Sequence, residues 1–277
     1  MLVKAKTLNG YELRSLDGNI GSAKEFYFDD RYWTIRYLVA NTGNWLTGRK
    51  VLISPYSISG IDTAAEEISV QLTKTQIEDS PPIASDKPVS RQFEDTYYGY
   101  YGFPYYWGGP FMWGYYPYPE RDLSKRGEHA GAANEWDSHL RSTYAVGSYH
   151  LLARDGEIGH VEDFVVDDET WAIRYLIVAT TDFWPGKKVL ISPQWIERVS
   201  WEESKVVIDL PRETIKEAPE YTDGSLLTRD HEIRLYGYYN RSGYWVDDLL
   251  PAQARPGMTS HPAGMHEASA LPLKARL

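Results

Sequence analysis

Paired carboxylates are the first residues whose type and spacing could do chemistry, because two neighbouring acids can serve as general acid and general base. The pairs are Asp29-Asp30, Glu162-Asp163, Asp167-Asp168 and Glu202-Glu203. Adjacent residues of a strand point to opposite faces of a sheet, so these neighbours cannot share a site unless a turn intervenes. We therefore interpret the pairs as turn residues and surface charges.

Metal, nucleophile and phosphate motifs are missing from the sequence. None of the seven histidines stands at a helical or zinc-type ligand spacing, and "HVED" at His160 falls on an expected strand that separates its members. There is no cysteine, and no G-x-S-x-G, P-loop or G-x-G-x-x-G sequence. The sequence therefore predicts no catalytic residue, no metal and no cofactor, and a protein that is not an enzyme.

Aromatic residues form candidate binding segments instead. From Tyr97 to Tyr118, 13 of 22 residues are Tyr, Trp or Phe, and a shorter arm runs from Leu235 to Trp245. The long arm has no Lys or Arg to hold a nucleic-acid backbone, which favours packing of the rings against apolar surface, including that of the opposite half of the protein. The alternative is an exposed patch that binds another chain. The candidate residues are Tyr98, Tyr100, Tyr101, Trp107, Trp113, Tyr236, Tyr238, Tyr239 and Trp245.

Arg36 and Arg174 are two further candidates, because each is an arginine among apolar neighbours of a predicted strand. Such an arginine can anchor a partner or an anionic ligand, or it can form an ion pair inside the protein with an acid such as Asp29 or Asp167. We expect the internal ion pair.

These residues recur because the sequence contains two copies of one segment. Residues 17–58 align without a gap on residues 155–196 at an offset of 138, and the offset still holds at Trp107 and Trp245. Between positions 11 and 81, 26 of 71 residues equal their partners. A period of this length is far too long for a solenoid repeat, so each copy should be a complete domain.

Each copy reads as short antiparallel strands followed by two short helices. Asp17-Gly18 and its counterpart predict a type I′ hairpin, "YWTIRYLVA" a central strand, and "RKVLISP" and "EISVQL" further strands. Thr73 with Gln76 predicts a capping box, and Ser90 starts the second helix, which Gly99 should end. Five or six such strands suffice to close a barrel.

The pattern "DGEIGHVEDFVVDDETWAIRYLIVA" followed by "GKKVLISP" resembles the PRC-barrel family, named after the cytoplasmic domain of the photosynthetic reaction centre H subunit. The resemblance covers roughly residues 5–80 and 142–218 and is closer in the second copy. It implies a mainly β fold of two tandem small barrels, each with short C-terminal helices and an aromatic arm. It also implies a binding or assembly module, since members include a ribosome maturation factor and share no catalytic motif.

The expected organisation is a first barrel with its arm at 1–107, an aromatic extension and polar linker at 108–138, a second barrel with its arm at 139–250 and a flexible tail at 251–277. A net charge of −10 argues against nucleic acid as a partner, and no apolar run reaches the ~20 residues of a membrane span.

We therefore expect a cytoplasmic, bacterial adaptor that binds a protein partner. The alternatives are a ribosome- or RNA-associated maturation factor and a structural or stress-related protein that self-associates as a homo-oligomer.

Overall fold

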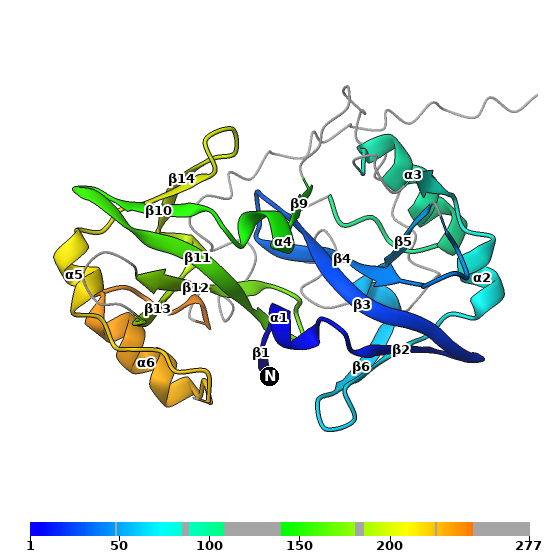
Figure 1. The fold of residues 1–277 in the computed structure, drawn as a ribbon, viewed down its shortest axis with the longest axis horizontal. Helices are drawn as coiled ribbons and strands as arrows, with labels where there is room; N and C mark the ends of the chain where they lie inside the picture. Colours follow the sequence, from blue (N-terminus) through cyan, green and yellow to red (C-terminus); the bar gives the residue numbers. More distant parts are fainter. Residues whose placement is uncertain (48, 85–88, 108–139, 181–185, 225, 246–277) are drawn as a thin grey trace, which may run out of the picture. The chain divides into compact units, whose positions relative to one another are not determined.

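The computed structural model describes residues 1–47, 49–84, 89–107, 140–180, 186–224 and 226–245 (Figure 1). They form a mainly β protein, as predicted. Residues 1–226 make one compact unit, which holds the strands of both copies, and residues 227–277 belong to a second. None of the described helices is long and apolar enough to cross a membrane.

The elements of the first copy are β1 (Leu2–Lys4), α1 (Ala5–Leu8), β2 (Glu12–Ser15), β3 (Gly18–Asp29), β4 (Thr34–Asn41), β5 (Arg49–Ile53), η1 (Pro55–Ser57), β6 (Ile58–Asp62), β7 (Glu67–Val70), α2 (Lys74–Glu78), β8 (Ile83–Ala84) and α3 (Arg91–Tyr101). Those of the second are β9 (Leu140–Ser142), α4 (Thr143–Val146), β10 (His150–Ala153), β11 (Gly156–Asp167), β12 (Ile173–Thr180), β13 (Lys188–Ile191), η3 (Pro193–Trp195), β14 (Ile196–Ser200), β15 (Lys205–Ile208), α5 (Arg212–Lys216) and α6 (Arg229–Tyr238).

The two copies form sheets with the same order of six strands, to which the first copy adds the edge strand β8. The order is β6-β7-β2-β3-β4-β5-β8 in the first copy and β14-β15-β10-β11-β12-β13 in the second. In both, the long strand after the hairpin pairs antiparallel with the central strand, β3 with β4 and β11 with β12. The central strand β4 is buried from Thr34 to Ala40, which explains its continuous run of β-branched and aromatic residues. The repeated sequence therefore encodes a repeated topology.

The hairpins lie where the sequence places them, but their turns differ from the prediction. Ser15 pairs with Gly18, so Leu16 and Asp17 form the connection. Gly18 has a φ of 137° and opens β3, whereas Asp17 is not among the residues with positive φ, as a type I′ turn would require. The Asp17 carboxylate instead accepts hydrogen bonds from the Ser15 hydroxyl and from the Lys74 backbone N–H at the start of α2.

Helix starts follow the predicted caps, whereas the predicted helix end is wrong. Thr73 and Gln76 form the full capping box, and the Ser90 hydroxyl caps α3. Gly99 lies inside α3, and the helix ends at Gly102 with a φ of 68°. The residue that corresponds to Gly102 in the second copy is Asn240, with a φ of 50°. Glycine and asparagine tolerate this left-handed conformation better than other residues.

The copies exchange their first strands. The strand β1 of the first copy pairs with β11 of the second, and β9 of the second pairs with β3 of the first (Figure 1). The pairings Leu2↔Asp167 and Leu140↔Asp29 are related by the sequence offset. Such reciprocal contacts are what a twofold relation between two equal copies produces.

A pair of backbone hydrogen bonds closes the junction at its centre. The Ile35 N–H donates to the carbonyl oxygen of Trp171 at 2.8 Å, and the Ile173 N–H donates to that of Trp33 at 2.7 Å. Both tryptophans have positive φ, 53° and 58°. This conformation is uncommon for a bulky residue, so the packing around the junction must hold it.

Aromatic rings from the strands pack across this junction. Phe26 lies 6.3 Å from Trp171 and Phe28 lies 5.7 Å from Phe164, measured between ring centroids. All four side chains are buried. Such pairs stabilise a junction through the apolar area they bury and through their ring geometry.

Candidate interaction site

Arg36 forms the predicted internal ion pair. Its guanidinium is fully buried, and Nη2 lies 3.5 Å from Oδ2 of Asp29. The other oxygen of Asp29 accepts the backbone N–H groups of Arg31 and Tyr32 in the turn before β4. The Tyr106 ring lies 4.0 Å from the guanidinium carbon of Arg36 and adds a cation–π contact. This arginine therefore holds the turn and the arm together.

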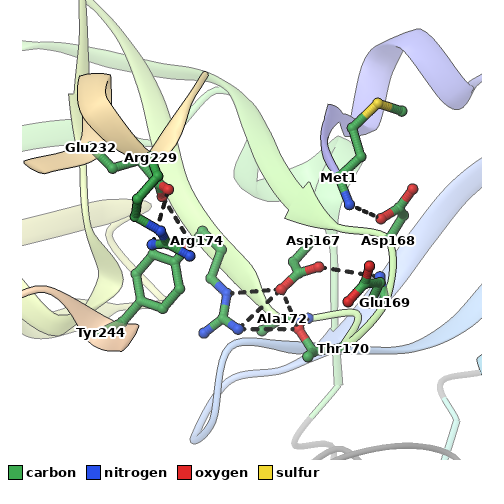
Figure 2. Close-up of polar contacts among 10 residues, drawn as sticks. All are labelled: Met1, Asp167, Asp168, Glu169, Thr170, Ala172, Arg174, Arg229, Glu232 and Tyr244. Carbon is green, nitrogen blue, oxygen red and sulfur yellow. Dashed lines mark hydrogen bonds and ion pairs between the residues drawn. The ribbon is translucent and has the colours of Figure 1, made fainter. Parts of the chain in front are cut away.

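Arg174 makes the equivalent contact in the second copy. Its Nη2 lies 3.0 Å from Oδ2 of Asp167 and 3.2 Å from the Thr170 hydroxyl oxygen (Figure 2). Burial alone would raise the pKa of Asp167, but the Arg174 charge and the Thr170 hydroxyl outweigh it, so the pKa lies below its usual value. The prediction of matched carboxylate contacts is confirmed in both copies.

The chain start is tied to the second copy beside this pair. The amino group of Met1 forms an ion pair with Asp168, the residue after Asp167 (Figure 2). Partial burial lowers the pKa of this amino group, but the hydrogen bond and charge of Asp168 outweigh it, so the pKa is raised. The contact holds β1 in place on β11.

The described part of the long aromatic arm, as far as Trp107, packs on its own copy, and the rest of the arm lies outside the described residues. The Tyr97 hydroxyl donates to the carbonyl oxygen of Leu52 at 2.9 Å and accepts the N–H of Ser54 at 3.2 Å. The Tyr97 ring lies 5.4 Å from that of Tyr37 on β4. Strand β5 and its η1 turn supply backbone polar groups that a tyrosine at this position can reach.

A buried carboxylate organises the arm. Glu94 is fully buried and accepts hydrogen bonds from the hydroxyls of Tyr37, at 3.0 Å, and Tyr106. Arg91 completes the group, with Nη1 3.0 Å from Oε2 of Glu94 and its guanidinium carbon 4.4 Å from the centre of the Trp107 ring. Burial raises the pKa of both tyrosines well above their usual value. The cluster is neutralised internally and is structural.

The same cluster recurs in the unit that begins at residue 227. Arg229 forms an ion pair with Glu232 at 3.0 Å, and the Tyr244 hydroxyl donates to Glu232 at 2.8 Å (Figure 2). The guanidinium carbon of Arg229 also lies 4.3 Å from the centre of the Trp245 ring. Sequence reasoning missed this Arg-x-x-Glu pair and its tyrosine, although the repeat offset joins Arg91 to Arg229. A search of the repeat for matched charged residues would have found it.

An open pocket of about 510 Å³ lies beside α3 in the first copy. It is lined by Tyr56, Ser57, Gln71, Leu72, Gln76, Tyr100, Tyr101 and Phe103. The hydroxyls of Tyr100 and Tyr101 both donate to the backbone carbonyl oxygen of Gln76 on α2, at 3.0 Å and 3.3 Å. Tyr100 is 42% exposed. Sequence reasoning singled out these two tyrosines but missed Tyr56 and Phe103.

The remaining aromatic candidates divide by burial. Tyr98, Tyr236 and Tyr239 are buried, so they stabilise the fold. Trp107 and Trp245 stack on arginines, and Tyr238 is 37% exposed. Trp113 lies outside the described residues.

The described residues hold no group of three or more His, Asp or Glu that could bind a metal ion. The pocket beside α3 is lined by apolar, aromatic and neutral polar residues.

Comparison with protein families finds a match within the chain. The profile of the PRC-barrel domain matches residues 153–215, from the end of β10 through α5. This segment is a PRC-barrel domain. The match falls on the second copy, and a search of curated proteins found no match. The PRC-barrel assignment suggests a protein-interaction module.

Proposed function

We propose that this chain is a non-catalytic adaptor that binds a partner protein through two PRC-barrels held together as one scaffold. The profile match supports the second barrel, and the equal strand order supports the first. In this proposal the barrels with their arms span 1–107 and 139–250, joined by the segment 108–138 and followed by the tail 251–277. We place its action in the bacterial cytoplasm.

The single observation that carries the proposal is the exposed aromatic pocket of the first copy. The charged candidates are used internally, because Arg36 and Arg174 both pair with carboxylates of their own turns. Tyr100, in contrast, leaves 42% of its surface accessible at the pocket mouth. Tyrosines at such positions combine a large apolar ring with a polar tip, as binding surfaces do.

Self-association is the second candidate, favoured by the exposure of aromatic rings elsewhere on the first unit. Tyr144 on α4 is 85% exposed, whereas an aromatic side chain in a protein core is almost fully buried. A second chain could cover it.

Photo-crosslinking in native cells tests the adaptor proposal. A benzoyl-phenylalanine placed at Tyr100 of the full-length protein should form a saturable crosslink to a defined protein, identified by mass spectrometry. The same group at Tyr238, the equivalent position of the second copy, is the matched control. The adaptor proposal fails if no specific protein adduct forms at position 100, and crosslinks only to the chain itself favour self-association.

A further inference from the structure

The pocket beside α3 has a closed apolar floor and an accessible aromatic wall. Tyr56 and Leu72 are buried at its base. Phe103 joins base and wall, with its ring 4.8 Å from that of Tyr56 and stacked on Tyr101 at 5.1 Å with 12° between the planes. Tyr100 stands nearly perpendicular to Tyr101 at 82°. The rings therefore support one another and do not need a ligand to stay in place.

The residues that line this pocket carry no charge. A phosphate or carboxylate would lose its hydration without a cation to replace it. Polar contacts come instead from neutral groups at the rim. The Gln76 side-chain oxygen accepts the Thr73 backbone N–H, which leaves its exposed N–H₂ group able to donate to a carbonyl oxygen. The pocket thus fits a neutral ligand with apolar rings and accessible carbonyl groups.

Comparison between the copies distinguishes the pocket residues that the fold requires from those that it does not require. At the repeat offset, Gln194 corresponds to Tyr56, and Arg241 corresponds to Phe103. The residue that corresponds to Leu72 is again a leucine, Leu210. Tyr238 and Tyr239 correspond to Tyr100 and Tyr101, so both tyrosines are retained in the second copy. The second copy builds the same strand order without the two rings, so the topology does not require them. Their presence in the first copy alone points to a role beyond folding.

We propose, building on the adaptor function, that this pocket binds a proline-rich segment of the partner in the polyproline II conformation. Such a segment has no internal hydrogen bonds, so its carbonyl groups remain free, and its rings pack on aromatic-lined grooves. It is also preordered, which lowers the entropy cost of binding. An amphipathic helix needs a longer apolar groove, and a pocket of about 510 Å³ is the right size for two or three residues rather than several helical turns.

Binding of a fluorescent ten-residue polyproline peptide to the full-length protein tests the proposal by fluorescence polarisation. Saturable binding is expected, with an affinity at least 10-fold weaker in Tyr100→Ala and unchanged in Tyr238→Ala. Tyr56→Gln with Phe103→Arg, which gives the pocket the residues of the second copy, should abolish binding. Tyr100→Ala keeps the test decisive if this double variant does not fold, because that side chain is 42% exposed and lies outside the core.

Three results would overturn the proposal. They are absence of saturable binding, equal affinity of Tyr100→Ala and wild type, and equal affinity for an apolar helical peptide of the same length. Failure here with a persisting protein crosslink at Tyr100 would leave the adaptor function standing and remove only the polyproline ligand. Failure of both would remove the adaptor function as well.

Discussion

Replacing Arg36 with methionine probes the buried ion pair of the first copy directly. Arg36 is fully buried, and its partner Asp29 is 4% exposed, so the substitution leaves a carboxylate with little access to water. Breaking such a pair from one side costs about 3–5 kcal/mol. Loss of the contact with the Tyr106 ring contributes to this cost, since a desolvated cation–π contact is worth about 2 kcal/mol.

Arg174→Met is the matched control in the second copy. There the side chains of Arg174 and Asp167 are 13% and 16% exposed, so water reaches the remaining carboxylate. We expect a smaller loss of stability, about 1–3 kcal/mol, because partial solvation offsets the lost partner. The order of the two effects is thus set by exposure and not by distance, since the second pair is the shorter one.

Urea unfolding of the full-length variants, followed by circular dichroism, measures both losses. The double variant Arg36→Met with Asp29→Asn should be more stable than Arg36→Met alone, because it removes the unpaired charge. A loss below about 1 kcal/mol for Arg36→Met, or a larger loss for Arg174→Met, would contradict the buried-pair argument.

Three further perturbations test other contacts. Gly21→Ala should lower the melting temperature strongly, because a Cβ there would lie 2.1 Å from the backbone carbonyl of Asn41, whereas Gly60→Ala, with open space, should not. The lowered pKa of Asp167 contributes stability that is complete above the unfolded-state value of about 3.9 and is lost as the pH falls through the folded pKa. Asp167→Asn should therefore weaken the acid dependence of unfolding below about pH 4; an unchanged profile would refute this. Phe28→Ala should cost about 3–5 kcal/mol and destabilise both copies together, as seen by hydrogen exchange on each.

Local sequence signals predicted the elements well, because each depends on residues close together in the chain. Thr73 and Gln76 stand three residues apart, and their capping box needs nothing else. The burial of the central strand can be predicted from its apolar run. The ion pair of its arginine can be predicted from the acid in the preceding turn. The helix end was mispredicted because Gly99 and Gly102 both offer left-handed backbone, and only packing of the arm selects between them.

The way in which the two copies combine depends on contacts between distant segments. The two equal copies, their strands and the matched arginines can all be read from the sequence, because each of them repeats at the offset of 138. The pairing of β1 and β9 with the opposite copy cannot be predicted from the sequence. An edge strand can form hydrogen bonds with any free strand edge, and its side chains do not specify which edge that is. Nor does the sequence show that Tyr56 contacts Phe103, because Tyr56 lies in η1 and Phe103 follows α3, and the two rings meet only in the folded chain. Contacts between distant segments depend on which surfaces are left uncovered after the sheets form, and local residue patterns do not record that.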